Sequence, residues 1–522
     1  MKRFSIILSV ICIGILSAAC RSNTTNPDTT KNFVMPEDAE HFPVIKIIST
    51  NNNGSNDFVL TPVAKHVKES QMSWGDYHNK NVPDPWYEDC DIYDGDTLIG
   101  SGKVKVRGNW TTNYPKKSLR IKFDKKQKMF GLNSDEKFKN WVLLAAFKDA
   151  SFLRDAVGLQ LYRKLFPGYA SDCRLVEVEV NGTSLGVYLL AEQQEAKRLG
   201  LTEPKDNATN TDIGYLIEFD SYSYTEAENE QFTINYLGNI KDYNGTKLNN
   251  PQNGYTIKSD ITDKAQHDFI ADYMNNLWKI CYEAVYNHKY YRFTESYGLE
   301  MFTPEGATDN EKCENCVKDI IDLGSLADFY IFNEIICDPD LYLTSFFMNV
   351  DFAAGKDKKL YFNAPWDFDS TMGNKSFAIE DTSKEQSHKR NMSKIDEMFA
   401  GLCQTDVNCN DKKEHANPWM VIFIREAWFQ NIVKDRWSKL NTAGALNEIC
   451  SFIDTNSSDD YQPVFNFTRS LWGNPSEDGE LCEASRAAAK ESQQASAEYL
   501  KDWLTKRIAA VGNIINGLQP KD

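Results

Sequence analysis

Apolar and polar residues alternate along the first half of the chain in short runs that are typical of half-buried β-strands. Such runs occupy residues 44–50, 102–106 and 118–123. Residues 141–145, apolar throughout, and residues 213–219 predict two further strands. Two alternating runs, 175–180 and 185–190, flank Asn181-Gly182, and an Asn-Gly pair in this position predicts a β-hairpin.

Helical spacing of apolar residues begins at 149–166 and dominates the second half of the chain. The predicted helices there cover residues 265–285, 317–336, 419–437 and 487–515. Between them, residues 341–373 are interpreted as a strand pair and the polar residues 374–394 as a loop. A strand-rich first half with a mixed sheet, followed by a helical second half, predicts an α+β fold.

The N-terminus carries the pattern of a secretory signal. Lys2 and Arg3 precede an apolar run, residues 4–16, which is too short to remain as a membrane-spanning helix. Small residues lead directly into Cys20 and resemble a bacterial lipobox, which predicts removal of residues 1–19 and lipidation of Cys20. The alternative is an ordinary cleaved signal with an incidental cysteine.

Residues 20–40 are rich in Asn, Thr, Asp and Pro, and they predict a flexible tether. We therefore expect a protein of the bacterial cell envelope, periplasmic or surface-exposed, that is held to a membrane, with the outer membrane favoured, only by its N-terminal lipid. The globular body is predicted to begin at residue 41.

Composition and net charge limit the kinds of molecule that the protein is expected to bind. Of the 522 residues, 41% are hydrophobic and 12% aromatic, as in a globular protein, and the formal net charge is −17. A strongly acidic chain is a poor ligand for nucleic acid, which requires a basic face. We expect no nucleic-acid partner, although a local basic pocket remains compatible with this charge.

Beyond Cys12 and Cys20 the chain contains ten cysteines. An even number in an exported protein predicts several disulfides, and Cys403 with Cys409 is the most local candidate pair. Cys313 and Cys316 have CxxC spacing, but no second metal-spaced pair or thioredoxin-like context accompanies them. We interpret them either as a structural disulfide or as members of two disulfides with distant cysteines.

An acidic motif follows a short predicted strand at 360–362. Asp367 and Asp369 lie two residues apart, between a tryptophan and a glycine turn. In an extended backbone such side chains point the same way, about 6.6 Å apart. With modest bending they could share one Mg²⁺-like cation, or they could act as an acid and a base.

A basic segment, residues 105–120, is the counterpart of the acidic motif. Arg107 precedes a glycine turn, and Lys116 and Lys117 follow a Tyr-Pro bend at the start of the next strand. Cations on adjacent strands beside exposed backbone amides suit a polyphosphate. The alternative is a solvated, charged edge strand that guards against aggregation.

The order of these motifs closely resembles the CotH kinase family, atypical protein-kinase-like proteins first associated with spore coats. The resemblance spans about residues 42–374, and residues after about 400 match less clearly. It implies a kinase-like domain at 41–400, strand-rich to about 260 and helical with the acidic site from 261, followed by a helical extension at 401–522. The matching segments are Arg107–Thr111, Pro115–Phe123, Trp141–Ala145, Asp149–Arg154, Val180–Glu192, Asn333–Asp340 and Pro365–Asp369.

The resemblance implies transfer of the γ-phosphoryl group of ATP to a protein Ser or Thr, with Mg²⁺ or Mn²⁺. Asp340 occupies the position of the catalytic acidic residue, which orients the substrate hydroxyl and accepts its proton. Asp367 and Asp369 would hold the cation. The candidate nucleotide ligands are Arg107, Lys116, Lys117 and Glu192, the last either contacting the nucleotide or orienting a lysine.

One departure from the family pattern concerns the metal. Five residues after Asp340, spore-coat members carry an Asn that can bind a metal, whereas this chain has Ser345. This departure, with an envelope location where ATP is scarce, keeps open a non-catalytic, pseudokinase-like protein that binds a protein or glycan. A carboxylate-based glycan hydrolase using Asp367 and Asp369 is a further alternative.

Overall fold

The computed structural model describes most of the chain after the predicted tether. The described residues are 35–36, 39–51, 55–60, 87–108, 110–205, 208–235, 238–249, 251–375, 395–405, 414–477 and 481–521. The predicted signal, Cys20, most of the tether, Cys409 and most of the predicted loop 374–394 lie outside them. The described part is 39% helix and 22% strand, with strands concentrated in the first half, so the predicted α+β class is confirmed.

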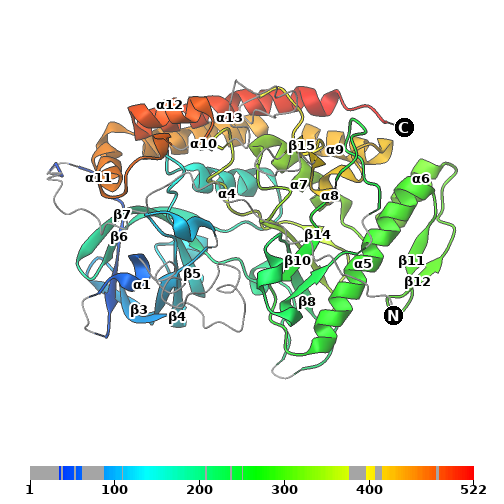
Figure 1. The fold of residues 1–522 in the computed structure, drawn as a ribbon, viewed down its shortest axis with the longest axis horizontal. Coiled ribbons are helices and arrows are strands. Elements are labelled where there is room, and N and C mark those ends of the chain that lie inside the picture. Colours follow the sequence, from blue (N-terminus) through cyan, green and yellow to red (C-terminus); the bar gives the residue numbers. More distant parts are fainter. Residues whose placement is uncertain are drawn as a thin grey trace, which may run out of the picture.

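The first half of the chain forms a closed β-barrel, at the lower left of Figure 1. Neighbouring strands pair antiparallel, except that the first strand pairs parallel to β6. In barrel order the strands are β1 (Val44–Ser49), β2 (Glu88–Asp94), β3 (Thr97–Val106), β4 (Leu119–Gln127), β5 (Phe138–Leu144), β7 (Thr183–Glu192) and β6 (Cys173–Val180).

Alternation along the strands places one set of side chains inside the barrel and the other outside. Strand β5 shows both environments: Trp141 and Leu143 belong to the barrel core, whereas Val142 and Leu144 pack into a second, larger core. This double burial explains why residues 141–145 are apolar throughout. The predicted hairpin is also confirmed, because Asn181 and Gly182 join β6 to β7 with φ of 48° and 78°, as a type I′ turn requires.

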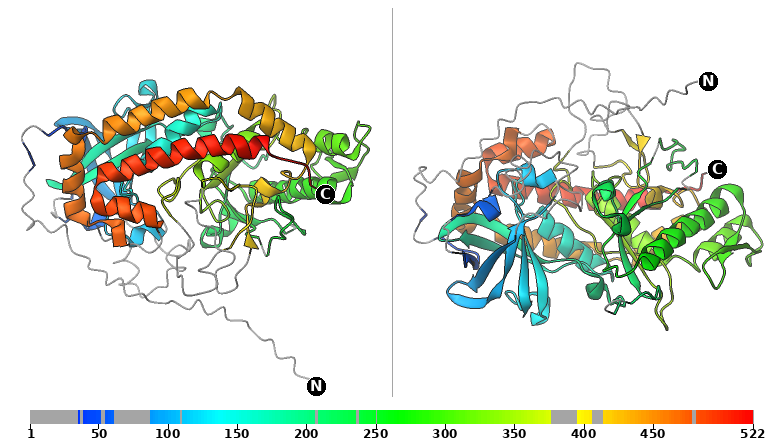
Figure 2. Two further views of the ribbon diagram at one scale, coloured as in Figure 1. Left: turned by 90° about the horizontal axis from the view of Figure 1, so that it is seen from above. Right: turned by 60° about the horizontal axis from the view of Figure 1, so that its bottom comes forward.

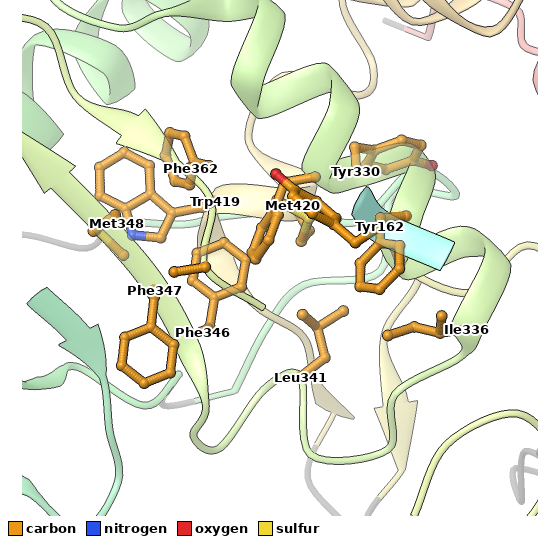
Figure 3. Packing of buried hydrophobic residues seen from close by; sticks show 14 of the residues in the cluster. Tyr162, Tyr330, Ile336, Leu341, Phe346, Phe347, Met348, Phe362, Trp419 and Met420 are labelled. Atoms are coloured by element: carbon orange, nitrogen blue, oxygen red, sulfur yellow. The ribbon is translucent and has the colours of Figure 1, made fainter. Parts of the chain in front are cut away.

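A second sheet follows the barrel. Its strands are antiparallel and run in the order β14 (Tyr361–Phe362), β13 (Phe346–Asp351), β8 (Gly214–Phe219), β10 (Gly254–Ile257) and β9 (Gln231–Thr233). The larger core packs against this sheet, and Figure 3 shows Phe346, Phe362 and Trp419 within it. The rings of Phe346 and Phe362 lie 5.8 Å apart, and those of Phe362 and Trp419 5.6 Å apart.

Helices cover the barrel and the sheet along one side of the molecule (Figure 1). Figure 2 shows that the last helix, α13 (Gln493–Asn516), lies beside α10 (Thr442–Asn456). The main helices are α4 (Arg154–Leu165), α5 (Lys264–Asn287), α6 (Asp309–Val317), α7 (Leu323–Ile336), α8 (Pro418–Val421), α9 (Ala427–Lys439), α10 (Thr442–Asn456), α11 (Gln462–Trp472), α12 (Glu483–Glu491) and α13 (Gln493–Asn516).

Two predicted helices are divided by capping residues. The prediction 317–336 joins the end of α6 to α7, but Asp322 accepts a hydrogen bond from the Ser325 amide at 2.7 Å and starts a new helix. The prediction 487–515 joins α12 to α13, and there Ser492 adopts an extended backbone and caps α13. Side-chain capping therefore sets these boundaries.

The expectation of several disulfides is not supported. No disulfide joins two described residues, and six of the described cysteines are buried or half-buried free thiols. These are Cys90, Cys173, Cys281, Cys313, Cys316 and Cys450. The CxxC pair lies on α6, at its contact with α5.

Of the helices in the described ranges, none combines the length and apolar character needed to cross a bilayer.

A fully buried ion pair joins the last helix to α7. Arg507 of α13 contacts Glu334 of α7 at 2.9 Å, and both side chains are completely buried. Glu334 also accepts hydrogen bonds from the amides of Phe399 and Gly401, at 2.8 and 3.3 Å. The guanidinium of Arg507 donates to the carbonyls of Ile395 and Glu397. The hydrogen bonds of this ion pair therefore hold residues 395–401 against both α7 and α13.

Replacing Arg507 with Met should lower the free energy of unfolding by about 3–5 kcal/mol, because Glu334 would remain buried without its cation. Urea denaturation would measure the change. Lys506→Met is the matched control, since Lys506 pairs with Asp502 at the surface and each side chain is 58% exposed. The control should cost less than about 0.5 kcal/mol. Equal losses in the two variants would contradict the role of the buried pair.

Candidate active site

A cleft of about 2000 Å³ separates the barrel from the second sheet. Its barrel wall, formed by β3, β4 and β5, is mostly basic, and its opposite wall, near β8 and β10, is mostly acidic. The cations of the barrel wall include Lys105, Arg107, Arg120, Lys122, Lys137 and Lys139, and the acids opposite them include Glu218, Asp220, Glu226, Glu230 and Asp260. Asp155, Asp340, Asp367 and Asp369 also line the cleft.

The Asp367–Asp369 motif lies in a bent segment, not in an extended strand. Strand β14 ends at Phe362, and Asp367 has φ of 68°, so the spacing expected for an extended backbone does not apply. Positive φ is uncommon outside glycine and is often found at functional positions. The buried rings of Trp366 and Phe368 alternate with the two aspartates and anchor the segment. The carboxylates are thereby left facing the cleft.

Contacts with helix α4 hold the segment of Asp367 and Asp369 in place. A Cβ at Gly158 would come within 2.4 Å of the Phe368 ring, so glycine is needed for this close approach. The Phe368 amide donates to Asp155 in the first turn of the helix at 2.8 Å. Asp149 and Arg154, both buried, form an ion pair at 2.5 Å, and Arg154 Nε donates to the Thr371 carbonyl at 3.1 Å. Residues Asp149–Arg154, one of the segments that resemble the CotH kinase family, thus hold the turn that carries Asp367 and Asp369.

Negative charge accumulates in this part of the cleft. Desolvation raises the pKa of Asp367, and the nearby charges of Asp369 and Asp340 raise it further. Burial, followed by the charges of Asp369 and Asp367, raises the pKa of Asp155 well above its usual value. Burial also raises the pKa of Asp369, and the positive charge of Lys375 opposes this shift. Such mutual repulsion is the environment that a bound cation relieves.

Asp340 and Ser345 lie on the turn that connects α7 to β13. The Asp340 amide donates to Asp338 at 2.9 Å, and Ser345 has φ of 60°. Glu218 of β8 holds the end of this turn, because it accepts hydrogen bonds from the Ser345 amide and the Thr344 hydroxyl at 3.0 and 3.1 Å. Asp340 and Ser345 both line the same cleft as Asp367.

Lys258 completes the support for this turn. Its ammonium lies 2.7 Å from Glu218, and the charges of Glu218 and Asp220 raise the pKa of Lys258 against the effect of its burial. The resulting ion pair fixes the carboxylate that holds Ser345.

Arg107 lies where the sequence predicts a phosphate ligand. It lines the cleft at the end of β3, with its guanidinium over the Trp366 ring at 5.7 Å. Burial lowers the pKa of Arg107, and the negative charge of Asp367 opposes that shift. The basic and acidic motifs therefore meet in one cleft.

The prediction for Lys116 and Lys117 is not supported by their placement, because neither lines the cleft. Lys116 is buried, with Nζ donating to the carbonyls of Ala145, at 2.8 Å, and Val187. Burial lowers its pKa well below the usual value. Lys117 donates to the carbonyls of Thr112 and Tyr114, at 2.9 and 2.8 Å, and stabilises the preceding turn. Both ammonium groups are used inside the fold.

Glu192 is also directed away from the cleft. Its carboxylate lies 2.9 Å from Arg198 and accepts hydrogen bonds from Tyr169 and Asn133, at 2.8 and 3.0 Å. Arg198 itself lines the cleft. Glu192 therefore orients an arginine, where the sequence predicted a lysine or direct contact with the nucleotide.

Asp155, Glu218, Asp220 and Lys258 are the site residues that sequence reasoning missed. Two of them carried a signal, since Glu218 and Asp220 are carboxylates at the end of an otherwise apolar strand, Gly214–Phe219. Asp155 resembles an ordinary acidic residue in the first turn of a helix. Lys258 follows a short strand and carries no distinguishing pattern.

In the described ranges, no three acidic, histidine or cysteine side chains converge closely enough to enclose a metal by themselves. This geometry does not suit a structural metal cage. It is compatible with Mg²⁺, which commonly takes one or two carboxylates and completes its octahedron with water and substrate phosphates.

Substituting Asp155 with Asn should stabilise the metal-free protein at pH 8. The pKa of Asp155 is raised in the folded state, so this residue favours folding at low pH and loses that contribution as the pH rises through its raised pKa. Asn removes the charge and can still accept the Phe368 hydrogen bond. We expect a gain on the order of 1 kcal/mol at pH 8 that largely disappears at pH 4.5.

Thermal unfolding in EDTA at both pH values tests this expectation. Asp502→Asn, at an exposed position on α13, is the control and should show no such gain. A Tm change for Asp155→Asn that is the same at both pH values would contradict electrostatic repulsion as its cause.

No curated protein matched the chain. The family model described as CotH kinase protein matches residues 104–511, which is most of the chain. The match begins near the end of β3, includes the segment with Asp367 and Asp369 and helices α7 to α12, and ends within α13. The chain therefore belongs to the CotH kinase protein family.

Proposed function

We propose that the protein is an ATP-dependent phosphotransferase of the CotH type, with an atypical protein-kinase-like fold, that transfers the γ-phosphoryl group to Ser or Thr of a protein. The supporting observation is that Arg107 lines one cleft with Asp340, Asp367 and Asp369, which follow it by more than 200 residues in the chain. Phosphoryl transfer depends mainly on positioning and on charge neutralisation, and this arrangement provides groups for both.

The residues fit a divalent cation and a triphosphate. Asp367 and Asp369 present oxygen ligands whose pKa values are raised by burial and neighbouring acids, so a cation would relieve their repulsion. These two carboxylates would hold Mg²⁺ or Mn²⁺, which would supply positive charge to neutralise the phosphate oxygens. Arg107 would contact the same phosphates, and Arg120 and Lys105, paired across β3 and β4, supply cations further along the wall.

Asp340 is the proposed group for the acceptor hydroxyl. It would orient the Ser or Thr of the substrate and accept its proton as the phosphoryl group is transferred. The turn holding Asp340 is fixed through Glu218 and Lys258, which limits its movement. Ser345 would contribute at most a weak metal ligand from the same turn.

We also propose that the protein acts at the cell envelope. The predicted lipid on Cys20 would be its only membrane attachment, and its substrate or partner would be a protein of the same compartment. The net charge of −17 supports a partner other than nucleic acid.

The decisive experiment uses the soluble chain beginning after Cys20. Calorimetry would measure binding of Mg·ATP, and γ-labelled ATP with casein as a generic acceptor would measure transfer. We expect binding that EDTA abolishes and label on protein serine or threonine. Absence of metal-dependent ATP binding would refute the proposal.

A non-catalytic, pseudokinase-like protein that binds an envelope protein or glycan is the second candidate. The observation in its favour is Ser345, whose short side chain is a poorer cation ligand than the amide of Asn and whose own amide is held by Glu218. Metal-dependent ATP binding without turnover or transfer would support it. A glycan hydrolase is less well supported, since a neutral sugar does not require the basic barrel wall.

A further inference from the structure

The turn after Asp369 is held by the C-terminal helices as well as by α4. Asn374 is completely buried, and its three side-chain hydrogen bonds join the turn after Asp369 to the segment before α4 and to α12. Its amide nitrogen donates to the carbonyls of Asp369 and Lys148, at 2.6 and 3.1 Å. Its amide oxygen accepts the hydroxyl of Ser485, on α12, at 2.5 Å. Ser485 therefore orients the side chain that holds the backbone of Asp369.

A second contact comes from α13. The Tyr499 hydroxyl donates to the Gly373 carbonyl at 2.9 Å, and its ring lies 5.9 Å from the Arg154 guanidinium. Gly373 has φ of 75°, and a Cβ there would come within 2.7 Å of the Tyr499 hydroxyl and 2.5 Å of the Trp503 ring. The backbone of the turn at Gly373 thus packs directly against α13, with no space for a side chain between them.

From these contacts we infer that Ser485 and Tyr499 are positioning residues for the divalent-ion site, so that helices α12 and α13 set its metal affinity. The inference rests on the proposed function and identifies what controls its site. Neither side chain lines the cleft. Both act through the backbone that presents Asp369, and a ligand held out of position binds a cation less well.

The test compares Ser485→Ala, Tyr499→Phe and the double variant in the soluble chain beginning after Cys20. Each single substitution deletes one hydroxyl and leaves the packing almost unchanged. Mn²⁺ affinity, measured by electron paramagnetic resonance in the presence of ATP, should fall on the order of fivefold in each single variant. Ser485→Thr keeps a hydroxyl and should restore most of the affinity. Hydrogen exchange of the amides at 370–375 should accelerate in the two single variants.

Two controls separate positioning from general loss of stability. Thr505→Ala deletes an exposed hydroxyl on α13 that bonds only to the Lys501 carbonyl, and it should leave Mn²⁺ affinity unchanged. Val433→Ala truncates a fully buried side chain of α9 away from the turn, so it should lower Tm without changing Mn²⁺ affinity.

The outcomes are distinguishable. Unchanged Mn²⁺ affinity in the double variant, or an equal loss in Val433→Ala, would overturn the inference while leaving the proposed function intact. Failure of the parent protein to bind Mn²⁺ and ATP would refute the proposed function. In that case, unchanged hydrogen exchange at 370–375 in the variants would overturn the positioning role as well.

Discussion

Asp367→Asn should abolish metal-dependent ATP binding. The substitution keeps the size of the side chain and removes one negative charge from the acidic side of the cleft. At about 4 Å and an effective dielectric constant near 20, even a single charge pair is worth about 4 kcal/mol. We therefore expect Mg·ATP affinity to fall at least about a hundredfold. Calorimetric titration with Mg·ATP would measure the loss.

The same variant should remain folded. Relief of the repulsion among Asp367, Asp369 and Asp340 should maintain or raise Tm in EDTA, since the pKa of Asp367 is raised in the folded state. Asp435→Asn, at an exposed position on α9, is the matched control and should bind as the parent does. Wild-type affinity in Asp367→Asn would show that this carboxylate does not hold the cation.

The placement of the cations shows where sequence reasoning succeeds and where it fails. Arg107 directly follows a strand whose alternation is clear, and the structure places it in the lining of the cleft. Lys116 and Lys117 come from the same basic segment, and the sequence predicts the same role for them as for Arg107. The sequence does not reveal that the ammonium of Lys116 reaches two carbonyl oxygens and lies over two aromatic rings in the interior.

The barrel shows a comparable limit. Each strand of the first half has a local pattern, and the Asn181-Gly182 hairpin follows from its turn residues alone. Closure of the barrel depends on the parallel pairing of β1 with β6, whose paired residues are more than 120 positions apart. Local alternation carries no information on such pairing. The class of fold was therefore predictable from the sequence, whereas the barrel topology was not.

The acidic site was predicted from its residues and not from its geometry. The motif of Asp367 and Asp369 was interpreted as an extended strand, whereas Asp367 has positive φ and the segment is bent. The bend depends on contacts with Gly158 and Asp155 of α4, more than 200 residues earlier. Glu218 supports the turn of Asp340 from 127 residues earlier in the chain, and Lys258 contacts Glu218 in turn. A motif thus indicates candidate ligands, and the tertiary contacts decide how they face one another.

Asp340→Asn should separate binding from turnover. Asn keeps the size of the side chain and an oxygen that can accept a hydrogen bond from the acceptor hydroxyl, but it cannot take up the proton. Loss of a general base typically slows a reaction by about 10²–10⁴-fold. Transfer from γ-labelled ATP should fall by that factor, while Mg·ATP affinity should stay within a few fold of the parent.

The fold of the turn should survive this change, because it is built by backbone groups. The Asp340 amide donates to Asp338, and the Asp340 carbonyl accepts from the amides of Leu343 and Thr344, at 2.7 and 3.1 Å. If Asp340→Asn lost affinity as severely as Asp367→Asn, Asp340 would be a metal ligand and not the acceptor of the proton. If transfer remained within tenfold of the parent, another group would orient the hydroxyl, and phosphoryl transfer would depend on cation and phosphate positioning alone.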